Sequence, residues 1–219
     1  LAEEKPMKPH DPIGMLATGV EPVPRRAATR RLVWALAAGL PLAALVMLTQ
    51  FGLRRDLVQA MFWPMLWMKI MFPFFIAWGG FVLAQRLARP GARVGRAWLT
   101  LAVPIVMVWA MALVRWFGAP QDERVNLLMG QTWNTCPFNI ALIALPVFVA
   151  GMLALRGLAP TRPGWAGAAV GVLAGGAGAT VYALHCTEST APFLAVWYLG
   201  GMLIPVLAGA LLGPRLLRW

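Results

Sequence analysis

The chain has two cysteines, and each stands at the edge of an apolar run. Cys136 lies in WNTCPFN, whereas Cys186 lies in VYALHCTEST, directly after His185 and two residues before Glu188. Thiols beside an imidazole and a carboxylate can form a disulfide, bind a soft metal ion or react with an oxidant. The chemistry therefore depends on whether the fold brings Cys136 to the cluster around Cys186.

Three interpretations of these side chains follow from the residues alone. A disulfide between Cys136 and Cys186 would join two helix ends. Two thiolates with the imidazole of His185, and with Glu188 as an auxiliary ligand, would suit a zinc or cadmium ion or form an oxidant sensor. A catalytic dithiol is disfavoured, because disulfide-exchanging enzymes commonly use a C-x-x-C motif that this chain lacks. The spacing matches no zinc signature, so the disulfide and the sensor both stay open.

The composition identifies the kind of element that must position these groups. Of 219 residues, 60% are hydrophobic and 12% are charged, compared with about 25% charged residues in soluble globular proteins. The net charge of +11 could indicate nucleic-acid binding. However, the basic residues stand in short clusters between apolar runs, which is typical of loops beside a lipid bilayer. We therefore expect a membrane protein that does not contact nucleic acid directly.

Six apolar runs are long enough to cross a hydrocarbon core of about 30 Å as helices. We predict an all-α integral membrane protein, a bundle of six transmembrane helices preceded by a short cytoplasmic segment. The expected spans are 32–51, 58–83, 97–116, 137–155, 166–184 and 192–212.

The distribution of positive charge predicts the orientation. Six spans place both termini on one side, and 14 of the 19 lysine and arginine residues fall on that side, against four on the other. Because cytoplasmic loops carry the excess of positive charge, we expect a bacterial inner-membrane protein with both termini in the cytoplasm. Cys136 and Cys186 then lie in the periplasm, where a disulfide can persist.

Lys69 is the one cation deep inside an expected span, whereas Arg115 stands next to the last residue of 97–116. Lys69 stands 11 residues into 58–83, roughly 16 Å along the helix, where a charged side chain costs about 2.5–3.5 kcal/mol. None of the six runs contains a carboxylate to pair with it. Lys69 therefore either takes part in signal relay or acts as a structural plug that binds backbone oxygens or reaches toward water.

Glycines mark one close helix contact. Gly167, Gly171 and Gly175 repeat every four residues, so they form one smooth helix face that lets another helix approach closely. The partner is expected to be another helix of the same bundle, with a homodimer as the alternative.

The N-terminal region divides into two parts. Residues 1–6 are interpreted as an expression remnant, and 7–31 as a cytoplasmic segment before the membrane domain 32–219. Within the segment, the residues Ile13, Leu16, Ala17 and Val20 form one apolar stripe of a short helix that Asp11 could cap. Such a stripe fits docking into a groove of a partner; a disordered tail or a strip lying on lipid are the alternatives.

Seven stretches spread along the chain also match one known family. They are DPIGMLATGVEPVPRR, MLWMKIMFP, LARPG, TWNTCPFNIALIALPVF, LRGLAPTRPGWAGAAVG, YALHCTESTAPFLAVWY and GALLGPRLLRW. Over residues 10–219 the chain resembles the six-span anti-sigma factors called negative regulators of sigma F.

This resemblance implies a regulator and not an enzyme. Such a protein holds an extracytoplasmic-function (ECF) sigma factor at the inner membrane and releases it when a metal or oxidative signal reaches two cysteines, here Cys136 and Cys186. A transiently bound soft metal ion is the only cofactor implied. The sigma-binding segment would be 11–31, including Arg25 and Arg26. A small transporter or a thiol-redox membrane enzyme is the alternative, although the chain lacks the clear internal repeat common in transporters.

Overall fold

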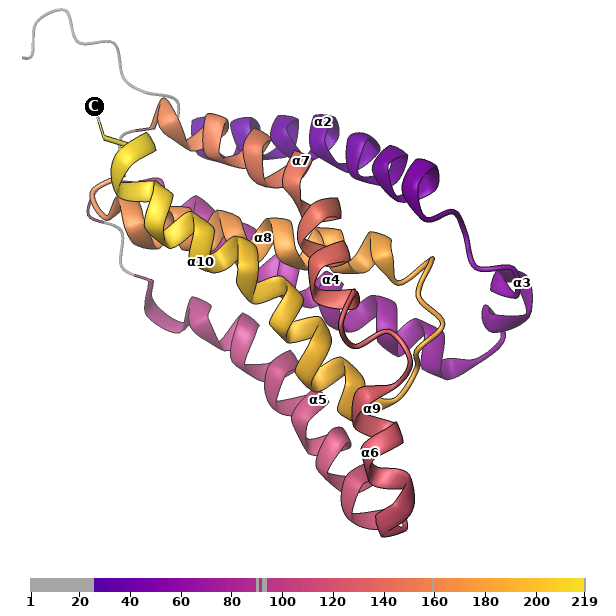
Figure 1. The fold of residues 1–219 in the computed structure, drawn as a ribbon. Coiled ribbons are helices and arrows are strands. Elements are labelled where there is room, and N and C mark those ends of the chain that lie inside the picture. The colour runs from indigo at the N-terminus through magenta and orange to yellow at the C-terminus, as the bar shows by residue number, and fades with distance from the viewer. Residues whose placement is uncertain (1–25, 90, 92–93, 159, 219) are drawn as a thin grey trace, which may run out of the picture.

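The computed structural model describes residues 26–89, 91, 94–158 and 160–218. Within these ranges the chain is helical and contains no strand, and six helices are long and apolar enough to cross a membrane. The predicted all-α, six-span architecture is confirmed (Figure 1). The spans are α2 (Ala27–Gln50), α4 (Pro64–Leu87), a 3-10 turn with α5 (Gly95–Trp98 and Leu99–Gly118), α7 (Cys136–Arg156), α8 (Pro163–Tyr182), and α9, a π-helical turn and α10 (Ala191–Phe193, Leu194–Tyr198 and Leu199–Leu216).

The second span begins later than predicted. The expected range 58–83 is wrong at its start: residues Leu57–Ala60 form a separate short helix, α3, and α4 begins at Pro64. Proline favours the first turn of a helix because its missing N–H has no partner there in any case. Lys69 is therefore the sixth residue of α4 and lies near the start of the helix, not 11 residues inside it.

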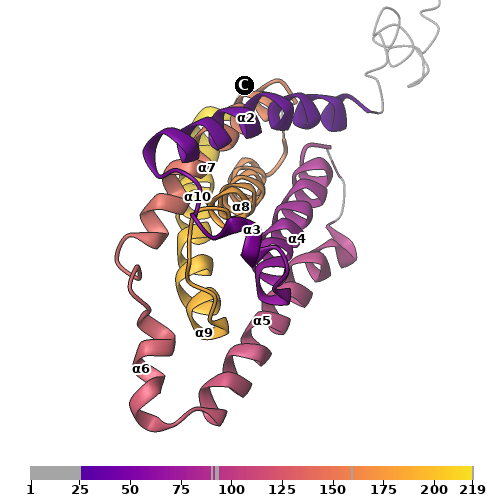
Figure 2. The same ribbon diagram turned by 90° about the vertical axis from the view of Figure 1, so that its right-hand side faces the viewer.

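Helix α8 is the centre of the bundle (Figures 1 and 2). A methyl group added at Gly171 would lie 2.2 Å from the carbonyl oxygen of Pro205 on α10, and one at Gly176 would lie 2.5 Å from the amide nitrogen of Ala77 on α4. Gly178 meets Ala144 of α7 in the same way. Backbones thus approach α8 directly from three helices, which only residues without a side chain permit.

The glycine repeat of α8 faces α10 of the same chain. Added methyl groups at Gly167 and Gly175 would collide with the carbonyl oxygens of Gly209 and Met202. The prediction of packing within the bundle is confirmed, and this face is not available as the seam of a homodimer.

Helix α7 links the two ends of the molecule. It begins at Cys136 and packs along α2, where Gly39 lies directly against the backbone of Val147. Beyond the far end of α7, the guanidinium of Arg31 lies against Gly157. The start of α2, which follows the N-terminal segment, is therefore at the opposite end of the bundle from Cys136 (Figure 1). The apolar stripe predicted for 13–20 lies outside the described residues.

Candidate functional site

The two cysteines meet at the end of the bundle away from the start of α2 and the end of α10 (Figure 1). Cys136 is the first residue of α7, and Cys186 lies in the loop 183–190 that follows α8. Both are free thiols, with exposed fractions of 0% and 3%, and their side chains are hydrogen-bonded to each other. The structure therefore brings together the two thiols that the sequence singles out.

The loop is shaped by the way α8 ends. The amide nitrogens of Leu184 and His185 donate hydrogen bonds of 3.2 and 3.0 Å to the carbonyls of Val181 and Tyr182, three residues back, so the last helical turn tightens before the chain becomes extended. Cys186 follows this turn and is buried beside Cys136, the first residue of α7.

Lys69 lies beneath this loop and is completely buried. Its Nζ donates a 2.6 Å hydrogen bond to the carbonyl oxygen of Cys186 and a second, short one to the carbonyl oxygen of Glu188. The ammonium also lies 5.4 Å from the centre of the Tyr198 ring, within the range of a cation–π interaction. Lys69 thus binds backbone oxygens, as one of its two predicted roles requires; the relay role stays a prediction.

His185 and Glu188 do not join the thiols. The Nδ1 of His185 is 3.0 Å from the carbonyl oxygen of Gly52, and a carboxylate oxygen of Glu188 accepts a 2.7 Å hydrogen bond from the amide nitrogen of Gln131. Among the described residues, no group of three or more His, Cys, Asp or Glu side chains is arranged to hold a metal ion. The three-ligand set of Cys136, Cys186 and His185 is therefore not assembled, because neighbouring residues at the end of a helix point in different directions.

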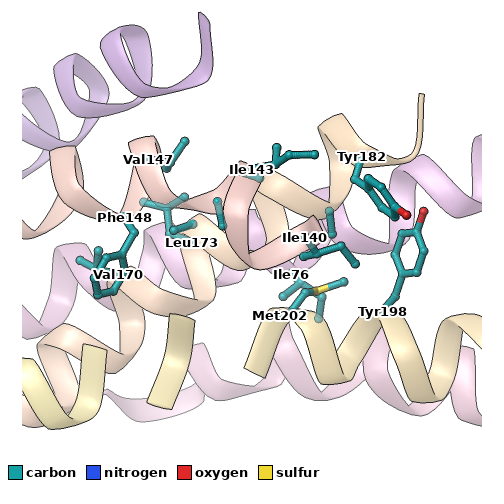
Figure 3. Close-up of a cluster of buried hydrophobic side chains, with 14 of the residues drawn as sticks. Ile76, Ile140, Ile143, Val147, Phe148, Val170, Leu173, Tyr182, Tyr198 and Met202 are labelled. Carbon is teal, nitrogen blue, oxygen red and sulfur yellow. The ribbon is translucent and has the colours of Figure 1, made fainter. Parts of the chain in front are cut away.

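Two tyrosines complete the site, and sequence reasoning missed them. The rings of Tyr182 and Tyr198 are 6.0 Å apart, and their hydroxyl groups point toward one another (Figure 3). Asn139 donates a 3.4 Å hydrogen bond to the Tyr182 hydroxyl, whereas the buried Tyr198 hydroxyl lies beside the Cys186 thiol and helps to lower its pKa. These are the only tyrosines in the sequence, and both stand within 12 residues of Cys186. This clustering could have indicated that they belong to the thiol site.

The electrostatics of the site favour a thiolate at Cys186. The hydrogen bond with Cys136 lowers the pKa of the Cys186 thiol, and the positive charge of Lys69 acts in the same direction, while burial opposes both. Because a thiolate is the form of cysteine that attacks oxidants and binds metals, Cys186 is the more reactive of the two.

The remainder of the loop is tied to neighbouring segments. The Thr190 hydroxyl and the Trp197 indole nitrogen donate hydrogen bonds of 2.8 and 2.9 Å to the carbonyls of Leu127 and Leu128 in α6 (Gln121–Met129), a short helix between the third and fourth spans. On its other side the loop borders a polar cavity of about 560 Å³. Its lining includes Arg54, Asp56, Leu66, Arg115, Thr187, Ser189 and Thr190.

Comparisons with known proteins agree with this architecture. The family model "Negative regulator of sigma F" matches residues 16–219. The chain is 44% identical to the probable anti-sigma-F factor NrsF of Azospira oryzae and 38% identical to the anti-sigma-F factor NrsF of Caulobacter vibrioides, in both cases over 97% of this chain and the full length of the relative. No solved structure matches. The chain belongs to the family of negative regulators of sigma F.

Proposed function

We propose that this protein is an inner-membrane anti-sigma factor that holds an ECF sigma factor through its N-terminal segment and releases it when a periplasmic signal reaches Cys136 and Cys186. The observation that carries the proposal is the pairing of two buried free thiols at the end of α7 that lies farthest from the start of α2. Both relatives are named as regulators, which supports this role over a transporter or a redox enzyme.

The packing supplies a route between the two ends. A change at Cys136 alters the first turn of α7, and α7 touches α2 at Gly39 and again near Arg31. The segment 7–25 continues directly into α2. A small displacement of α7 therefore changes how this segment is presented to a sigma factor.

Two kinds of signal can react with this thiol pair. With a peroxide, the Cys186 thiolate attacks one oxygen and forms an S–O bond, while the O–O bond breaks and the other oxygen takes up a proton and leaves as water. The Cys136 thiol then attacks the Cys186 sulfur, which forms the S–S bond and releases the sulfur-bound oxygen as a second water. In total one thiol, one thiolate, one proton and one hydrogen peroxide give a disulfide and two waters. A thiophilic divalent cation instead binds both sulfurs while Cys136 loses its proton to water.

The energy required for release is small. A signal shifts an equilibrium only by its difference in affinity for the two states, and a tenfold change in sigma affinity corresponds to about 1.4 kcal/mol. A disulfide contributes about 2–4 kcal/mol in typical cases, so either reaction is sufficient.

The thiol half of the proposal is tested by retention of the sigma factor. The factor that co-purifies with the wild-type chain from membranes of its native host is identified by mass spectrometry and then used as the probe. Cys136→Ser with Cys186→Ser should retain this factor but lose release by peroxide or by cadmium. Thr187→Ala, an exposed neighbour of Cys186, is the matched control and should respond normally. A double variant that still responds would refute the thiol model.

The binding half is tested at the N-terminus. Deleting residues 7–25 leaves α2 intact and should abolish recruitment of the sigma factor to membranes. Replacing Ile13, Leu16 and Val20 with serine should have the same effect, whereas Met15→Ser, which lies off the predicted stripe, should not. Normal recruitment by the deletion variant would exclude this segment as the binding element.

Orientation is tested with an introduced thiol, because the native cysteines are buried. Thr187→Cys in a chain with Cys136→Ala and Cys186→Ala provides one exposed thiol beside the site. A membrane-impermeant maleimide should label it from the periplasmic side in spheroplasts. Labelling only after the membrane is permeabilised would reverse the assigned topology.

A further inference from the structure

Lys69 is a buried cation without a carboxylate partner among the described residues. The one ion pair within 4.0 Å there is Arg54 with Asp56, and the Glu188 carboxylate is turned toward Gln131. Lys69 is instead held by two carbonyl oxygens of the loop and by the Tyr198 ring. These neutral partners do not cancel the charge of a buried ammonium, and the neighbouring group able to carry an opposite charge is the thiol of Cys186, whose own carbonyl accepts one of the two hydrogen bonds.

We propose that Lys69 is the latch of the thiol site: it holds the loop 183–190 closed through the carbonyls of Cys186 and Glu188, and it stays buried only while the Cys186 thiolate balances its charge. This inference rests on the proposed function and adds a positioning residue to it. Lys69 does not react with the signal but converts the reaction at sulfur into movement of the loop.

The net charge of the two sulfurs explains why an oxidant and a metal ion can both release Lys69. Before reaction, the thiolate of Cys186 and the ammonium of Lys69 cancel, while Cys136 is a neutral thiol. A disulfide has no charge, so Lys69 is left as an unbalanced cation. Two thiolates with a divalent cation are also neutral together, so Lys69 is again unbalanced. An oxidant and a metal ion therefore produce the same electrostatic change.

The structure offers this unbalanced ammonium a second position. Met65 and Leu66, four and three residues before Lys69, line the polar cavity beside the loop, and residues at these spacings share one helix face. The Asp56 carboxylate at this cavity is already paired with Arg54, and Arg115 also lines it, so the ammonium would be received by water. A lysine can extend its aliphatic stem along apolar surface and place its charge in water. Movement of Nζ toward this cavity would break both hydrogen bonds that hold the loop.

The first test uses the wild-type protein. Hydrogen exchange of the loop amides is measured by mass spectrometry before and after treatment with hydrogen peroxide, and separately with cadmium. Both treatments should accelerate exchange in 183–190 at least about tenfold, because the loop loses its anchor. Unchanged or slower exchange after complete disulfide formation would overturn the latch.

The second test removes the charge of Lys69. Lys69→Met keeps a side chain of similar length but has no ammonium, so a disulfide no longer leaves an unbalanced cation. This variant should still form the disulfide, yet its sigma retention should differ less than about twofold between reduced and oxidised forms, against about tenfold for wild type. Ile76→Ala, a buried residue of the same helix that does not line the cavity, is the packing control and should keep the response.

The pH dependence of alkylation separates the latch from a purely structural role. The midpoint for alkylation of Cys186 should move upward in Lys69→Met toward that of an ordinary cysteine, but not in Ile76→Ala. If Lys69→Met responds like wild type while the double cysteine variant does not, the latch is wrong and the proposed function stands. If the double cysteine variant also responds, the proposed function itself fails.

Discussion

The contact between α2 and α7 allows one substitution to be worked out in some detail. A methyl group added at Gly39 would lie 2.8 Å from the Cα of Val147 and 3.2 Å from its amide nitrogen. Carbon atoms pack best at about 3.5–4.0 Å, so Gly39→Ala must separate the two helices locally by roughly 1 Å. Overpacking of this kind costs about 1–3 kcal/mol.

The backbone contributes in the opposite direction. Alanine favours a helix over glycine by about 0.8–1.0 kcal/mol, so the net loss of stability from Gly39→Ala is about 0–2 kcal/mol. Gly200 in α10 provides the matched control, because no atom lies within 4 Å of a methyl group added there. Gly200→Ala should stabilise the protein by about 1 kcal/mol.

The assay compares the two variants with wild type in thermal unfolding of the purified protein in detergent. The difference between them isolates the interhelical collision, about 1–3 kcal/mol. Coupling energies of this size change affinity about 5- to 150-fold. Gly39→Ala should therefore change sigma retention at least about fivefold, while Gly200→Ala leaves it unchanged. Equal melting temperatures and equal retention for the two variants would refute the role of this contact in the relay.

Three further predictions concern the loop end of the bundle. The pKa of the Cys186 thiol is lowered by the hydrogen bond with Cys136 and by Lys69, so Cys186 should be alkylated at a nearly constant rate from pH 7 to 9. A free cysteine, with a pKa of about 8.5, would react faster as the pH rises. A steep rise over that range would contradict the thiolate assignment. Gly130→Ala should destabilise the protein by about 1–3 kcal/mol, because Gly130 has a φ of +54° and a methyl group there would lie 2.7 Å from the carboxyl carbon of Glu188. Thermal unfolding measures this loss, and an unchanged melting temperature would count against the described turn. Trp197→Phe removes the hydrogen bond to Leu128 and should cost about 1 kcal/mol, seen as faster amide exchange within 121–129; equal exchange rates would mean that this bond does not hold α6.

The sequence allowed the spans to be predicted, and with them the placement of both thiols at one end of the bundle, because both depend on local pattern. Runs of about 20 apolar residues imply helices, and the order of the spans puts Cys136 and Cys186 at the same end of the bundle. The start of α4 was missed because hydropathy stays high from Val58 to Trp63, although Pro64 is the residue that begins the helix.

The surroundings of the thiols could not be predicted because they depend on contacts between distant residues. Lys69 binds carbonyl oxygens 117 and 119 positions away, and backbone carbonyls leave no mark in a sequence. The orientation of His185 toward Gly52 likewise depends on how the loop after α2 passes the end of α8. A sequence pattern therefore locates reactive groups along the chain but does not give the directions in which they point.

The enclosure of α8 restricts which parts of the molecule can move. Backbone atoms of α4, α7 and α10 lie directly against it, so it can neither rotate nor slide without collision, whereas α2 and α5 each keep a broad apolar face uncovered by protein. Helix α8 is therefore the fixed part of the bundle, and the outer helices α2 and α5 are the parts that are free to shift. Lipids in contact with α2 and α5 would help to set the positions of these two helices, so membrane thickness and composition should affect how readily the protein responds.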